Sequence, residues 1–294
     1  MKLTTQQVTA FNRDGFLIAR GALQETDLQP VIDELNEFID ARANILFKEG
    51  KIDDLHEKAP FEKRYGLLFE QSKEIGDGLD IMHYRGKSIF EFLINENLLE
   101  LMESLLGPEL VCNPIQHIRA KPPLAIEGNS GASFHNAPWH QDAGVMMEEA
   151  EASDIVTVWI PIGDATQEMG CMEVIPGIVD TGYLRHVKEG GTTIDPTIMP
   201  ELKPVIAECA KGDIVLMSRF TPHRSTPNHS DICRWSLDLR YQPTGQHTGR
   251  TGHPDFIVRS HTNPTKEMHN YENWCTLWKN AFENPKGFVG HRSV

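Results

Sequence analysis

The spacing of apolar residues changes near residue 108, and this change restricts the folds that the chain can adopt. Before it, apolar residues recur at helical spacing and predict helices over residues 4–14, 25–48 and 87–106. Gly107-Pro108 ends the last helix, because proline cannot continue a helical hydrogen-bond ladder. After it, short apolar segments bounded by Gly, Pro, Asn and Asp predict strands over residues 110–120, 155–162, 172–175, 214–218 and 233–242.

No helical pattern of crossover length separates the predicted strands 155–162 and 172–175, and Lys211-Gly212-Asp213 begins another strand at a tight turn. We therefore expect antiparallel pairing in a mainly β fold with α, a double-stranded β-helix (jelly roll, cupin-like) with an N-terminal helical layer. The expected single domain, 1–294, consists of mainly helical support in 1–107, a jelly-roll core in 108–245, and a loop and C-terminal helix in 246–294. Two loop-rich segments, 178–202 and 243–270, are long enough to be functional covers or disordered.

Charge and apolar patterning exclude several classes of partner. The formal net charge is −14, from 42 acidic against 28 basic residues, which argues against nucleic acid or an anionic membrane as the main partner. No apolar run is long enough for a membrane span, and the N-terminus lacks the apolar core of a signal peptide. The five cysteines form no C-x-x-C pair, so we expect reduced, mostly buried thiols in a cytoplasmic protein. The oligomeric state stays open.

A metal-binding pattern lies in Trp139-His140-Gln141-Asp142, with a second histidine far downstream at His223. On a strand, alternate side chains share a face, so His140 and Asp142 can reach one metal ion together. Two imidazoles and one carboxylate form the facial triad that binds Fe(II) and leaves positions open for reactants. Open positions are typical of a catalytic centre. The alternative is a chance pairing, since the chain has 13 histidines.

A possible anion anchor lies on the last predicted strand, over residues 233–242. Its residues alternate, so one face is polar, formed by Arg234, Ser236, Asp238 and Arg240. A buried arginine needs a carboxylate partner, which its planar fork binds bidentately. Two interpretations stay open: Arg234 binds a dicarboxylate cosubstrate beside the metal, or Arg234 or Arg240 pairs internally with Asp238.

Several segments together resemble one known family, the phytanoyl-CoA dioxygenase family of Fe(II)/2-oxoglutarate-dependent oxygenases. Their order and spacing agree with the family over about residues 110–245, and the Asp14-Gly15-Phe16 segment resembles the usual family opening. The matching segments are residues 121–123, 139–142, 158–161, 168–177, 211–215 and 222–225, with Asn228 and Arg234.

The resemblance implies a jelly roll with Fe(II) bound by His140, Asp142 and His223. It also implies a dioxygenase that uses dioxygen and 2-oxoglutarate to oxidise, most simply to hydroxylate, a small organic substrate with release of succinate and CO2. The presence of Asp142 disfavours halogenation, because halide-inserting relatives lack that carboxylate.

For the cosubstrate, the resemblance implies that Arg234 binds the distal carboxylate of 2-oxoglutarate, with Ser225 nearby and Trp159 packed against it. Gln116 falls where the family often places a further polar contact. On the predicted strand, one face carries His117, Arg119 and Lys121, and the opposite face carries Gln116. Only one of these two faces can point into the cavity.

Three further residues are candidates for substrate contact. Arg224 stands where the family usually has glycine and adds a positive group close to the metal, although a solvent-facing arginine is an equal alternative. His135 lies just before the metal motif, where a turn or capping role is also open. Lys121 is the third candidate.

A non-catalytic jelly roll that binds a metal or small molecule is the alternative function.

Overall fold

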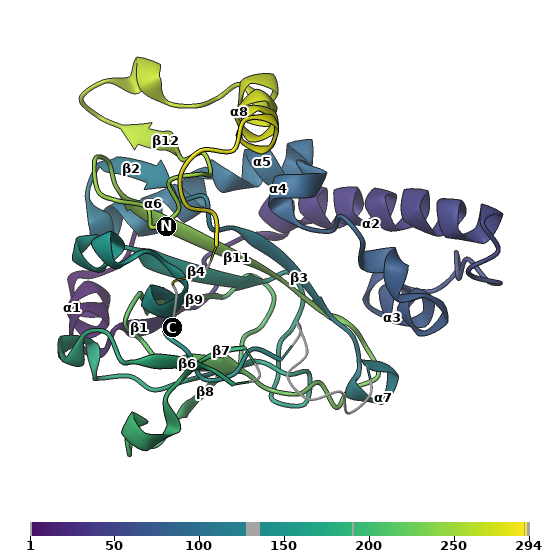
Figure 1. The fold of residues 1–294 in the computed structure, drawn as a ribbon, viewed down its shortest axis with the longest axis horizontal. Helices are drawn as coiled ribbons and strands as arrows, with labels where there is room; N and C mark the ends of the chain where they lie inside the picture. The colour runs from purple at the N-terminus through teal and green to yellow at the C-terminus, as the bar shows by residue number, and fades with distance from the viewer. Residues whose placement is uncertain (1, 128–135, 190, 291, 293–294) are drawn as a thin grey trace.

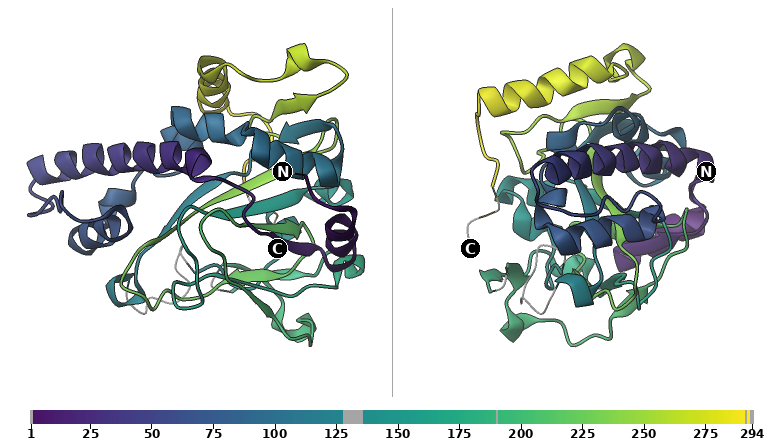
Figure 2. Two further views of the ribbon diagram at one scale, coloured as in Figure 1. Left: turned by 180° about the vertical axis from the view of Figure 1, so that it is seen from behind. Right: turned by 90° about the vertical axis from the view of Figure 1, so that its right-hand side faces the viewer.

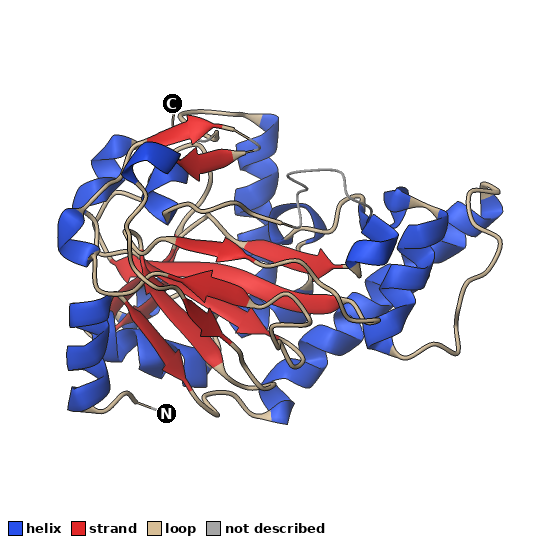
Figure 3. Cartoon of the chain, turned by 90° about the horizontal axis from the view of Figure 1, so that it is seen from below, coloured by secondary structure: helices blue, strands red, loops and turns tan. Residues whose placement is uncertain are grey.

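Antiparallel strands build the centre of the molecule. The computed structural model describes residues 2–127, 136–189, 191–290 and 292. Its larger sheet has the strand order β1-β9-β4-β11-β2-β12, with β3 also paired to β11. The bounds are β1 Phe16–Ala19, β2 Glu109–Cys112, β3 His117–Lys121, β4 Val156–Pro161, β9 Ile214–Ser218, β11 Arg234–Pro243 and β12 Phe256–Ser260. Figure 3 shows these strands side by side, with helices around them.

A smaller sheet packs against the inner face of the larger one. It has the order β10-β5-β8, with β5 Met172–Val174, β8 Val205–Ala207 and β10 His223–Ser225. A buried cluster joins the two sheets, with Trp159 and Met217 from the larger sheet against Met172 and Ala207 from the smaller. A separate hairpin is formed by β6 His186–Lys188 and β7 Thr192–Ile194. Two antiparallel sheets packed in this way confirm the predicted jelly roll.

Helices cover the outer face of the larger sheet. Figure 1 shows α2, α5 and α8 on one side of the strands and β8 on the other, and Figure 2 shows the same arrangement from behind. The bounds are α1 Thr5–Asp14, α2 Glu25–Lys48, α3 Phe61–Gln71, α4 Ile81–Tyr84, α5 Lys87–Leu93, α6 Glu96–Leu106, α7 Leu124–Glu127 and α8 Tyr271–Glu283. No helix in the described part of the chain is both long and apolar enough to span a membrane.

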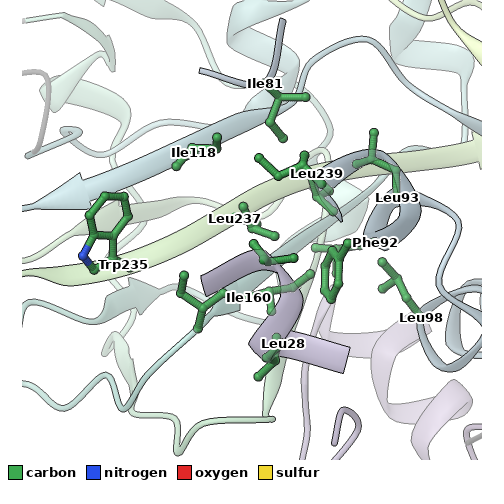
Figure 4. Packing of buried hydrophobic residues seen from close by; sticks show 14 of the residues in the cluster. Leu28, Ile81, Phe92, Leu93, Leu98, Ile118, Ile160, Trp235, Leu237 and Leu239 are labelled. Carbon is green, nitrogen blue, oxygen red and sulfur yellow. The ribbon is translucent and has the colours of Figure 1, made fainter. Parts of the chain in front are cut away.

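The alternation along β11 decides which face packs against the helices. Trp235, Leu237 and Leu239 point outward into a buried cluster that also contains Leu28 of α2 and Phe92 of α5 (Figure 4). The neighbouring residues of β11 therefore point into the space between the two sheets. The cluster continues from α1 to α8, which supports the single domain that we propose for residues 1–294.

Two predicted elements are each divided in the structure. The helix expected over 87–106 is α5 and α6, because the Asn95 side chain accepts a hydrogen bond from the Leu98 N–H and starts a new helix. The strand expected over 110–120 is β2 and β3, separated by residues 113–116. This segment contains Pro114, and proline cannot donate to a strand ladder.

The two segments expected to be loops contain strands. The 178–202 segment contains the β6–β7 hairpin, and the 243–270 segment contains β12, which pairs with β2. The predicted helices over 4–14 and 25–48 are confirmed as α1 and α2, whereas α3 was not predicted. All five cysteines are free, and four of them are buried, as expected.

Candidate metal centre

His140 and His223 are direct partners across an antiparallel bridge. The N–H of each donates to the carbonyl oxygen of the other, over 3.0 Å from His140 and 2.9 Å from His223. Side chains of such a pair project to the same side, and the two ring centroids lie 4.2 Å apart. The bridge lies at the start of β10, so the fold itself brings together two histidines that are far apart in sequence.

Backbone carbonyls determine the tautomer of both imidazoles. Nδ1 of His140 lies 2.8 Å from the Pro138 oxygen, and Nδ1 of His223 lies 2.9 Å from the Thr221 oxygen. A carbonyl oxygen can only accept, so each Nδ1 carries the proton and each Nε2 keeps its lone pair. Burial and the adjacent His223 lower the pKa of His140 to about 3, which keeps this ring in the neutral form that binds metals.

Asp142 reaches the same point from the turn that follows His140. Strand alternation does not place Asp142 beside His140, because His140 pairs in an isolated bridge and Asp142 begins a 3₁₀ helix over Asp142–Val145. The buried Gln141 side chain holds this turn by donating to the Gly182 and Phe220 carbonyl oxygens over 2.9 and 2.6 Å. This turn, rather than strand alternation, therefore places the Asp142 side chain beside the two histidines.

The Asp142 carboxylate is fully buried and has a donor on each oxygen. Arg240 Nη2 donates to Oδ1 over 2.6 Å, and the Thr157 hydroxyl donates to Oδ2. Burial alone would raise the pKa of the Asp142 carboxyl, but Arg240 and the two imidazoles hold it well below its usual range. Asp142 is therefore ionised without a metal ion.

Donor atoms of His140, Asp142 and His223 all lie within 4.8 Å of one another. The set offers two imidazole nitrogens with free lone pairs and one ionised carboxylate. This combination fits Fe(II) in a 2-His-1-carboxylate centre. The three residues that the sequence singled out as ligands therefore come together in the structure.

A cavity opens beside this cluster, lined by both histidines together with Trp159, Ser225 and Arg234. Further cavity residues are Arg119, Lys121, Ala137, Met172, Met217 and Asp238. Three of the lining side chains are cationic and one is acidic, so the cavity is suited to an anionic ligand. Arg119 and Lys121 of β3 line the cavity, whereas Gln116, which precedes β3, does not.

Arg234 is buried in this cavity wall without a carboxylate partner in the described part of the chain. Its Nη1 donates to the Ser236 hydroxyl over 2.6 Å, and its guanidinium lies 5.1 Å from the centre of the Trp159 ring. Its Nε is buried and has no hydrogen-bond partner among the residues that the structure describes. Burial lowers the pKa of Arg234 to about 10, so the group remains charged at neutral pH. A buried cation of this kind leaves room for an anionic partner in the cavity.

Arg240, not Arg234, forms the internal ion pair that the sequence left open. It lies 2.6 Å from Asp142 and 3.5 Å from Asp238. Lys121 lies next to Arg234, because the two are partners across β3 and β11, and its Nζ donates to the Ser225 hydroxyl over 2.6 Å.

Two other predicted residues that the structure describes, Gln116 and Arg224, do not line the cavity. Gln116 is buried elsewhere and donates to Asn113 O over 2.8 Å. Arg224 points away from His223, as expected for the next residue on a strand, and pairs with Glu173 over 2.5 Å. His135 lies outside the described residues.

Sequence reasoning missed the role of Thr157 and did not connect Arg240 with Asp142. One signal was available for Thr157, because it alternates with Trp159 on the predicted strand 155–162 and so shares its inward face. No local signal shows which inward side chains meet, since that depends on the register of β4 and β11.

Comparisons with known proteins identify the family of the chain. The profile of the family described as Phytanoyl-CoA dioxygenase (PhyH) matches residues 11–236. A 2-aminoethylphosphonate dioxygenase from uncultured bacterium HF130_AEPn_1 is 25% identical, with 81% of each chain covered. The phytanoyl-CoA dioxygenase domain-containing protein 1 homolog of Dictyostelium discoideum is also 25% identical, covering 82% of this chain and 92% of its own.

Solved structures show the same fold at low sequence identity. The nickel complex of the non-haem monooxygenase ThoJ has a TM-score of 0.60 at 16% identity, with 95% of each chain covered. The epimerase SnoN, in complex with Fe3+, alpha ketoglutarate and nogalamycin RO, has a TM-score of 0.56 at 17% identity, covering 84% of this chain and 87% of its own.

The family match spans most of the chain and includes all three clustered residues and Arg234. Together with the cluster, it indicates Fe(II) as the metal and 2-oxoglutarate as the cosubstrate of an oxidoreductase. The chain belongs to the phytanoyl-CoA dioxygenase family.

Proposed function

We propose that the protein is a dioxygenase that hydroxylates a small organic substrate and releases succinate and CO2 from 2-oxoglutarate. The observation that carries this proposal is the position of the buried Arg234 guanidinium. It lies in the wall of the same cavity as the two histidines of the His140, Asp142 and His223 cluster. A metal-binding jelly roll without turnover would not need a buried cation there, since burying an unpaired charge destabilises the fold.

In this proposal, His140, Asp142 and His223 hold the metal ion. With 2-oxoglutarate and dioxygen, bound Fe(II) supplies the oxidant for the substrate. Both imidazoles present an Nε2 lone pair because each Nδ1–H donates a hydrogen bond to a backbone carbonyl oxygen, and Asp142 is already ionised. The protein therefore releases no proton from His140 or Asp142 when it binds the metal at neutral pH.

Arg234 holds the distal carboxylate of 2-oxoglutarate through its planar, bidentate fork. Ser225 lines the same cavity, two residues after His223 on β10. Lys121, which we had considered for substrate, is better assigned to the cosubstrate end, because it contacts Ser225 and pairs with Arg234 across the strands. Trp159 covers the Arg234 guanidinium and excludes water from that side.

The proposal is tested by succinate formation from 2-oxoglutarate in air, with and without Fe(II). We expect slow succinate release even without added substrate, which requires iron and is abolished by His140→Ala. A candidate substrate then accelerates the reaction and is itself converted to a hydroxylated product. Iron binding without any succinate would favour the non-catalytic alternative, and succinate formation that survives the loss of His140 would contradict the proposal.

A further inference from the structure

We propose that Arg240 and Thr157 form a clamp that positions Asp142 for metal binding. They are positioning residues rather than catalytic residues, because they touch a ligand of the metal and line no part of the cavity. This inference rests on the proposed function, since it assigns a role at the same metal centre.

The clamp is built by the pairing of β4 and β11. Thr157 and Arg240 are direct partners in the register of these antiparallel strands. Both side chains point into the space between the sheets, so a hydroxyl and a guanidinium lie side by side on one surface. Asp142 comes from a different segment, the 3₁₀ helix over Asp142–Val145, and places one carboxylate oxygen on each donor.

Other contacts hold the guanidinium in place. Arg240 Nη1 donates to the Ile115 carbonyl oxygen over 3.1 Å, and Nη2 lies 3.5 Å from Asp238. The three members of the clamp are almost completely buried, with exposed fractions of 0% for Asp142, 3% for Arg240 and 1% for Thr157. Because water cannot replace a lost partner at this depth, each donor contributes more than it would at the surface.

Two donors on two oxygens fix the rotation of the carboxylate group. A carboxylate oxygen has more than one site for a hydrogen-bond donor or metal ion, so each oxygen of Asp142 can bind its donor and still offer a lone pair. In metal sites, such outer contacts orient the ligand and increase affinity for the ion. We therefore infer that the clamp holds Asp142 toward His140 and His223 before the metal arrives.

Arg234 and Arg240 show why this role belongs to Arg240. Both lie on the inner face of β11, yet Arg240 contacts two carboxylates, whereas Arg234 contacts the Ser236 hydroxyl. On the same strand, Arg240 therefore binds carboxylates of the protein, and Arg234 is left to bind a ligand.

Thr157→Val tests the clamp with the least disturbance, because valine keeps the branched shape and removes only the hydroxyl. Thr157→Ser is the matched control, since it keeps the hydroxyl. The probe is Co(II), titrated anaerobically into each purified full-length protein, with affinity and the visible Co(II) absorption spectrum as readouts. We expect Thr157→Val to bind Co(II) about 10- to 100-fold more weakly with an altered spectrum. Thr157→Ser should retain the wild-type affinity and spectrum.

Arg240→Met and Arg240→Lys form a second pair. The methionine variant leaves Asp142 buried without its charged partner, so its folding is checked by circular dichroism before titration. Lysine keeps the charge but loses the planar fork, so we expect it to recover part of the affinity.

The outcomes separate this inference from the proposed function. If wild-type protein binds Co(II) and forms succinate with Fe(II), but Thr157→Val matches the wild-type affinity and spectrum, the clamp is wrong and the proposed function stands. Equal loss in Thr157→Ser and Thr157→Val would also overturn the clamp, because the hydroxyl would then not be the cause. If wild-type protein binds no metal and forms no succinate, the proposed function fails, and the clamp fails with it.

Discussion

His140 and His223 exchange two backbone hydrogen bonds and place their rings 4.2 Å apart. The metal centre is therefore built around one cross-strand pair, with Asp142 added from the adjacent turn. Because the pairing is fixed by the backbone, the distance between the two imidazoles does not depend on a flexible loop. A site of this kind is prepared for its metal ion by the fold.

Arg234→Met should raise the KM for 2-oxoglutarate by about 10- to 100-fold, since charge-assisted hydrogen bonds to a carboxylate are lost. The measurement is succinate release as a function of 2-oxoglutarate concentration at saturating Fe(II). Arg224→Met is the matched control, because Arg224 lies outside the cavity and pairs with Glu173. Its KM should equal that of the wild type. An unchanged KM in Arg234→Met would remove Arg234 from the cosubstrate site.

Leu237→Ala should lower the free energy of unfolding by about 2–5 kcal/mol, because it opens a cavity where β11 packs against the helices. Leu237 is completely buried, whereas Leu202 is 49% exposed. Leu202→Ala should therefore change the free energy of unfolding by no more than about 0.5 kcal/mol. Urea unfolding of both variants provides the comparison. Equal effects would mean that the described core does not determine stability.

His253 should make the protein less stable in weak acid. Burial is the main cause that lowers the pKa of His253 to about 4, and the positive charge of Arg250 adds to it. A histidine in the unfolded chain titrates near 6.5. Between these values the unfolded chain binds more protons than the folded chain does. The free energy of unfolding contributed by this group therefore falls as the pH falls from about 6.5 to about 4.

His253→Phe tests this pH dependence, because phenylalanine can keep the contacts with Trp278 and Phe282 and cannot titrate. Urea unfolding at about pH 7 and about pH 5 should show a smaller loss of stability in the variant than in the wild type. His140 also has a lowered pKa, but it is present in both proteins, so its contribution cancels in the comparison. The same loss in both proteins would show that His253 does not cause it.

Periodicity predicted the elements that have a clear apolar pattern. The helix over 25–48 and the inward and outward faces of β11 agree with the structure, because burial of one face determines both patterns. The prediction failed where a single residue interrupts a pattern. Asn95 caps a new helix within an apolar stretch, and Pro114 separates β2 from β3.

The predicted metal ligands meet in the structure because three side chains in a specific order carry a strong signal. Their local backbone was predicted less well, since the turn at Asp142 depends on contacts of Gln141 with residues far away in sequence. The contact between Arg240 and Asp142 depends likewise on long-range packing, which no local pattern contains. Gln116 and Arg224 lie outside the cavity for the same reason, because strand breaks and side-chain direction decide their positions.

The central claim is that His140, Asp142 and His223 bind one Fe(II) ion. The most direct measurement is the iron content and Fe(II) affinity of anaerobically loaded wild-type protein, His140→Ala and His229→Ala. His229 is an exposed histidine outside the cluster and serves as the control. We predict one ion per chain in the wild type and in His229→Ala, and none retained by folded His140→Ala. One tightly bound ion in His140→Ala, at the wild-type affinity, would contradict the account.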